Sequence, residues 1–89
     1  MVKIMGNLGR QLNKLLGKND FNNVEFKVDE LESLQTIQLS KRDLAYAEYF
    51  KNVETLELNA FPSVTNEDLI YLIEKLKKIK TLKITEQNA

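Results

Sequence analysis

The chain has 89 residues, of which 43% are hydrophobic and 29% charged, and this composition predicts one folded domain with a modest core. Thirteen basic and thirteen acidic side chains give a formal net charge of zero, which argues against nucleic acid or an anionic membrane as the main partner. Cysteine and histidine are both absent, so we expect a non-catalytic cytoplasmic protein that needs no disulfide, metal or cofactor.

The first 20 residues predict an amphipathic helix that ends near Gly17. Lys3, Arg10, Lys14 and Lys18 make this segment basic. We interpret it as a helical cap over one end of the core, and the alternative is a basic helix that binds a membrane, nucleic acid or a protein partner. Its apolar side comprises Ile4, Met5, Leu8, Leu12, Leu15 and Leu16.

A short strand is predicted next, because apolar and polar residues alternate from Val24 to Val28. Only about six residues separate it from the next apolar segment, which is too few for a parallel crossover. We therefore expect antiparallel or edge pairing. The acidic residues that follow, Asp29, Glu30 and Glu32, are interpreted as a solvated loop, with a site for a hard cation as the alternative.

A nine-residue phrase with large apolar residues at positions 1, 4, 7 and 9 then occurs three times. The copies span residues 31–39, 50–58 and 76–84, so they begin 19 and then 26 residues apart. The last two apolar residues of each copy alternate with polar ones, which predicts three short strands. A phrase that recurs at such intervals indicates stacked repeats.

Helices are predicted in both connections between these strands. In the first, Ser40 and Asp43 resemble a capping box, and Leu44, Ala47 and Phe50 lie along one helical side. The second connection contains Pro62 in a loop and then a helix that begins after Thr65. Glu67 and Asp68 occupy its first turn, Val64 and Leu69 form a hydrophobic staple, and Lys75, Lys77 and Lys78 follow at its end.

The phrase resembles the leucine-rich repeat, L-x-x-L-x-L-x-x-N. The stretch Val53-Glu-Thr-Leu56-Glu-Leu58-Asn59 follows it with the asparagine two residues early, and residues 58–84 are similar to the longer ribonuclease-inhibitor type. The resemblance covers residues 31–86 and implies an α/β fold. That fold is a short stack of three parallel strands with intervening helices, in which an N-terminal helix and an edge strand act as a cap.

The chain is accordingly divided into a helical cap at residues 1–20 and a repeat-like α/β domain at residues 21–89, which together form one compact unit. A small α/β sandwich outside the family is the alternative.

If the strands stack in register, aligned polar residues form rows on the solvent-facing side of the sheet. Because leucine-rich repeat proteins usually hold their partners there, the resemblance implies a module that binds another protein. Cross-strand pairing that only fixes the register is the structural alternative. A second possible function is self-association through an uncapped strand edge, which would make a homo-oligomer. The residues expected to bind a partner are Thr36, Gln38, Thr55, Glu57, Asn59, Lys80 and Lys83.

Overall fold

The computed structural model describes residues 1–59 and 64–85, and its main feature is a three-stranded parallel sheet. The strands β3 (Thr36–Ser40), β4 (Thr55–Asn59) and β5 (Thr81–Thr85) lie side by side in that order. A 3₁₀ helix, η1 (Lys41–Phe50), joins β3 to β4, and the helix α3 (Asn66–Lys75) precedes β5. The three predicted strands are confirmed, whereas the predicted loop around Pro62 lies outside the described residues.

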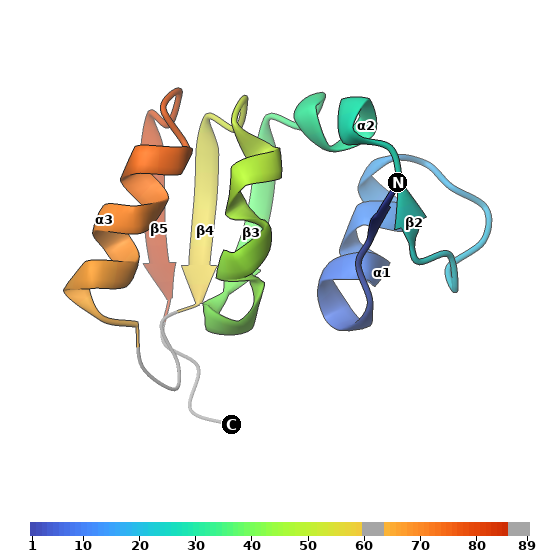
Figure 1. The fold of residues 1–89 in the computed structure, drawn as a ribbon, viewed down its shortest axis with the longest axis horizontal. Coiled ribbons are helices and arrows are strands. Elements are labelled where there is room, and N and C mark those ends of the chain that lie inside the picture. Colours follow the sequence, from blue (N-terminus) through green and yellow to red (C-terminus); the bar gives the residue numbers. More distant parts are fainter. Residues whose placement is uncertain (60–63, 86–89) are drawn as a thin grey trace.

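The core lies between the sheet and the two helices that pack on one of its faces (Figure 1). Alternate strand residues point toward the helices, as the pattern in the sequence predicts. Each fully buried leucine or isoleucine stabilises the fold by about 1.5–3 kcal/mol, so this layer supplies much of the stability. Its buried residues are Ile37 and Leu39 of β3, Leu56 and Leu58 of β4, Leu44, Ala47 and Phe50 of η1, and Leu72 and Leu76 in and after α3.

The capping box predicted at Ser40 is confirmed, and Thr65, predicted as an N-cap, also belongs to a capping box. The backbone N–H of Ser40 donates to Asp43 Oδ2 over 2.9 Å, and that of Thr65 donates to Asp68 Oδ2 over the same distance. The Lys41 ammonium also donates to Asp68 Oδ2, over 2.8 Å, and therefore ties the start of η1 to the start of α3. This hydrogen bond is the main reason why the pKa of Asp68 lies below its ordinary value of 3.8.

The N-terminal part contains a separate two-stranded sheet in which β1 (Val2–Lys3) pairs antiparallel with β2 (Glu25–Phe26). The strand predicted from Val24 to Val28 is therefore only two residues long, and it pairs antiparallel with β1 instead of forming an edge strand of the β3–β5 sheet. The short helix α2 (Val28–Glu32) replaces its end and also the predicted acidic loop. Glu30, in the first turn, accepts a hydrogen bond from the Lys27 N–H and pairs with Lys18, the two charged atoms being 2.7 Å apart.

The predicted N-terminal helix is α1 (Gly6–Leu15), which lies beyond the outer edge of β3. It ends in a Schellman motif, because Gly17 has a φ of 68° and the N–H of Lys18 donates to the Asn13 carbonyl over 2.9 Å. Leu8 and Leu12 join the core, whereas Met5 and Leu15 are exposed, so the predicted apolar side is wrong at those two residues. In the described ranges, no helix combines the length and apolar character needed to cross a membrane.

Candidate functional site

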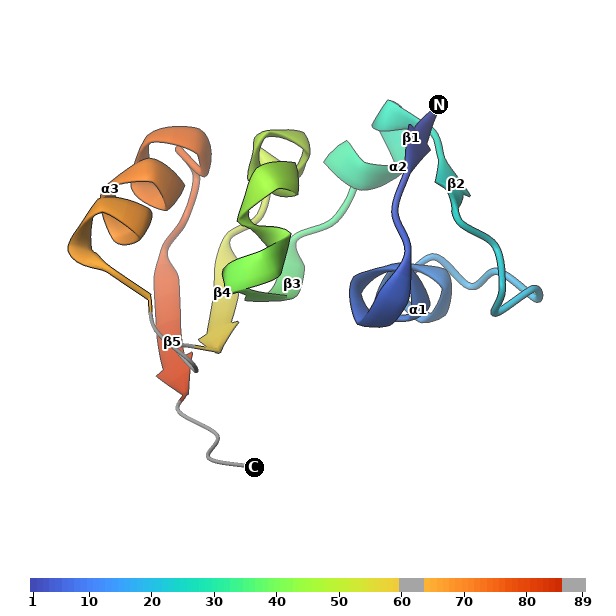
Figure 2. The ribbon, with the colours of Figure 1, turned by 60° about the horizontal axis from the view of Figure 1, so that its bottom comes forward.

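The sheet carries its helices η1 and α3 on one face only, and Figure 2 shows them on the same side of the strands. Parallel sheets in proteins are usually covered on both faces, and their strands are then apolar throughout. Here apolar residues alternate with polar ones in every strand, and the polar residues lie on the face opposite η1 and α3. This second face, called the uncovered face below, is the first candidate site.

Three rows of polar residues cross the uncovered face at right angles to the strands. The register aligns Thr36 with Thr55 and Thr81, Gln38 with Glu57 and Lys83, and Ser40 with Asn59 and Thr85. The predicted register is therefore confirmed at every position of the rows. The central row is neutral on β3, acidic on β4 and basic on β5, so its charge changes sign between neighbouring strands.

The predicted binding residues differ in their accessibility. On β3, Thr36 and Gln38 are exposed, while Thr55, Glu57 and Asn59 on the central strand β4 are half-buried. Lys83 is exposed on β5, and Lys80 lies just before that strand. The ammonium of Lys80 is 3.0 Å from a carboxylate oxygen of Glu54, which precedes β4. All seven predicted residues therefore belong to the strands β3–β5 or directly flank them.

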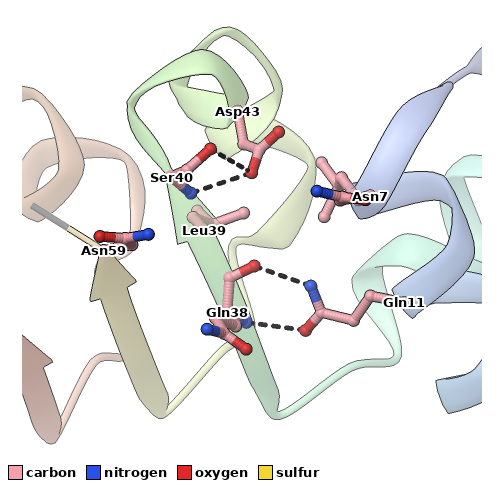
Figure 3. Close-up of a pocket in the computed structure, with 8 residues that line it drawn as sticks. Asn7, Gln11, Gln38, Leu39, Ser40, Asp43 and Asn59 are labelled. Atoms are coloured by element: carbon pink, nitrogen blue, oxygen red, sulfur yellow. Dashed lines mark hydrogen bonds between the residues drawn. The ribbon is translucent and has the colours of Figure 1, made fainter. Parts of the chain in front are cut away.

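An open pocket of about 310 Å³ adjoins this face at the carboxyl end of β3, between α1 and the sheet (Figure 3). Gln11 of α1 binds Gln38 twice, because its amide donates to the Gln38 carbonyl over 2.8 Å and accepts from the Gln38 N–H over 2.9 Å. Its side chain thus occupies the outer edge of β3 as a neighbouring strand would. The pocket is lined by Asn7, Leu8, Gln11, Gln38, Leu39, Ser40, Asp43 and Asn59.

The polar groups of this pocket are side-chain amides, one hydroxyl and one carboxylate, which recognise a ligand by hydrogen bonding. Open α/β sheets commonly bind ligands at the carboxyl ends of their strands. The carboxylate of Asp43 is already engaged, since Oδ2 accepts from both the N–H and the hydroxyl of Ser40. Among the described residues, no cluster of three or more acidic side chains is placed to hold a metal ion.

Sequence reasoning did not anticipate the contribution of α1 to this region. Asn7 and Gln11 line the pocket, and neither was identified as a site residue. One signal was present for Gln11, which follows the buried Leu8 by three residues and therefore lies on the core-facing side of the helix. The contact with Gln38, 27 residues away, depends on how α1 packs and has no counterpart in the local sequence.

Comparisons with known proteins do not identify the site. No family model matches the chain, and no curated protein was found to match it. Function therefore has to be inferred from the geometry and chemistry of the uncovered face, the adjoining pocket and the ends of the sheet.

Proposed function

We propose that the chain is a non-catalytic protein-binding module, built as a short leucine-rich-repeat-like stack, which holds a partner on the uncovered face. The observation that carries this proposal is the parallel sheet with helices on one face and ordered polar rows on the other. A sheet face without a helical layer leaves its side chains accessible, and the fixed register places their charges in a defined pattern.

The size of the face indicates what kind of complex it forms. Three strands spaced about 4.8 Å apart, each of five residues rising about 3.3 Å, cover roughly 240 Å² in plan. One partner in a stable interface typically contributes about 800 Å². We therefore expect a weak and rapidly exchanging complex, in which the opposite charges of Glu57 and Lys83 set the orientation of the partner.

The alternative function, in which the basic N-terminal helix binds a membrane or nucleic acid, has less support. A helix that binds a membrane inserts its apolar side, but Leu8 and Leu12 of α1 are buried in the core of the chain itself. The basic residues Lys3, Arg10 and Lys14 remain exposed, so salt-dependent binding that is lost when they are replaced by glutamine would favour this alternative.

The experiment is affinity capture from the native host, quantified by mass spectrometry, with a charge-swapped variant. The pair Glu57→Lys and Lys83→Glu reverses the charges on the uncovered face and still aligns opposite charges across β4 and β5. The matched control is the pair Glu32→Lys and Lys51→Glu, which swaps an ion pair of 2.9 Å outside the strands. Both pairs keep the net charge of the chain.

We expect the wild type and the control to capture the same proteins and the charge-swapped variant to lose them. Circular dichroism and thermal unfolding establish that both variants are folded. Equal capture by the folded charge-swapped variant would show that the uncovered face is not the binding surface.

A further inference from the structure

At the β5 end of the sheet, the apolar residues on the core side are exposed. Residues that align across the sheet are fully buried on β3 and β4 but exposed on β5, at the end of the row of strands in Figure 1. The exposed fraction along one row is 1% for Ile37, 0% for Leu56 and 40% for Leu82, and along the next row 1% for Leu39, 0% for Leu58 and 53% for Ile84. The strand β5 therefore has apolar residues at the positions that are buried on β3 and β4, although no described residues cover them.

The helix α3, which precedes β5, also carries exposed apolar side chains. Leu72 of α3 is buried, whereas Ile70 and Ile73 are exposed by 56% and 57%. An ordinary surface helix carries polar residues at such positions. The last strand and the last helix thus each present two large apolar side chains.

The backbone of β5 is open along the same edge. The N–H of Thr81 donates to the Glu54 carbonyl beside β4, so the neighbouring residue Leu82 and then Ile84 direct their N–H and C=O groups away from β4. In the described part of the chain, no strand pairs with this outer edge of β5. The opposite edge of the sheet differs, because Gln11 satisfies both backbone groups of Gln38.

The charges around the open edge select its occupant. Lys83 lies on β5, and Lys77 and Lys78 precede it, while the ammonium of Lys80 is already paired with Glu54. A second copy paired antiparallel about Lys83 would place that residue opposite its own symmetry mate, and like charges in that position are destabilising. A pair centred on Leu82 would place the apolar Ile84 opposite the charged Lys80, so neither register brings an acid beside Lys83. A second copy stacked head to tail would need the outer edge of β3, which α1 already occupies.

We propose that the outer edge of β5 accepts a strand from another protein, in which apolar residues alternate with acidic ones. The strand β4 shows the required chemistry on the inner edge. There, Leu56 and Leu58 align with Leu82 and Ile84, and Glu57 aligns with Lys83. A strand of similar chemistry on the outer edge pairs with the open backbone groups, covers both apolar side chains and places an acid beside Lys83. This binding mode shares Lys83 with the uncovered face, but it uses the outward backbone groups of Leu82 and Ile84, which the proposed function does not involve.

The test is a nuclear magnetic resonance titration of the whole chain with a synthetic peptide of the sequence of residues 53–59. We expect shifts and slower hydrogen exchange at the amides of Leu82 and Ile84, with little change at Thr81 and Lys83, whose amides face β4. A control peptide with lysine in place of both glutamates should bind about tenfold less tightly at low salt, because a lysine beside Lys83 replaces an attraction by a repulsion.

The variant Ile84→Pro removes one outward N–H without breaking the β4–β5 ladder, so it should stay folded and lose the peptide. Should this variant unfold, Ile84→Lys serves instead, because it removes only an exposed apolar side chain. No binding at millimolar peptide, equal binding of the control peptide, or protection at Thr81 and Lys83 would each overturn the proposal.

Concentration-dependent dimers that protect Leu82 and Ile84 would also overturn it, in favour of a second copy. Ile84→Pro leaves the uncovered face intact. If this variant still captures the partners of that face but loses the peptide, the two surfaces act separately, and a failure at the edge is distinguished from a failure of the proposed function.

Discussion

Replacing Gln11 by alanine tests whether α1 protects the outer edge of β3. The wild-type side chain forms two hydrogen bonds with the backbone of Gln38, with lengths of 2.8 and 2.9 Å. Alanine removes both bonds and leaves one N–H and one C=O of the strand facing solvent. Because alanine is a good helix former, the change does not weaken α1 itself.

The expected loss follows from those two bonds. A hydrogen bond within a protein contributes about 0.5–1.5 kcal/mol net, so two bonds give an upper range of about 1–3 kcal/mol. Gln38 is exposed, and water can replace part of the lost pairing, which places the expected loss near the lower end, at about 1 kcal/mol. In a domain of this size, that loss lowers Tm by about 4–8 °C.

Urea unfolding gives the free energy of unfolding, and the rate of hydrogen exchange at the Gln38 amide shows directly whether the outer edge of β3 is protected. The matched control is Lys14→Ala on the same helix, where the side chain is exposed. We expect the control to unfold like the wild type, and Gln11→Ala to unfold earlier with faster exchange at Gln38. Equal stabilities for the two variants, with unchanged exchange at Gln38, would refute a protective role for Gln11.

Three further predictions concern the core, a close contact and pH. Leu56→Ala should lower the free energy of unfolding by about 2–5 kcal/mol, because removal of this buried side chain leaves a cavity. Leu82→Ala, at the aligned but exposed position of β5, should lower it by clearly less, and chemical denaturation of both variants makes the comparison. Gly9→Ala should be destabilised by about 1–3 kcal/mol in thermal unfolding, because the added Cβ would lie 2.5 Å from the Ile4 carbonyl oxygen. The pKa of Asp68 is lower in the folded chain than its ordinary 3.8, so its stabilising contribution is present above that value and lost as pH falls through the folded pKa; Asp68→Asn should reduce this acid dependence of Tm.

Much of the sheet was predictable because three copies of one phrase also repeat its polar positions. The alignment of Thr36, Thr55 and Thr81 follows from the sequence once the strands are assumed to stack, and the structure has that register. The capping boxes at Ser40 and Thr65 were also predictable, since they depend only on residues three positions apart. Features that depend on residues close together in the chain, or on a repeated phrase, can therefore be predicted from the sequence.

The remaining features depend on packing. The alternation of Val24, Phe26 and Val28 indicates a strand, but the chain turns into α2 at Val28, where acidic residues suit the first turn of a helix. The 3₁₀ form of η1 was not predicted either. Ten residues span about 20 Å as a 3₁₀ helix and about 15 Å as an α-helix, and the periodicity of buried residues does not distinguish the two over so short a segment.

The two-layer arrangement also determines how the sheet bends. Neighbouring strands are about 4.8 Å apart, whereas packed helices need 8–10 Å between their axes. When each strand is followed by one helix on the same side, the helical layer is wider than the strand layer, and the sheet curves toward its bare side. A partner with a convex surface would fit the inside of this arc better than a flat one.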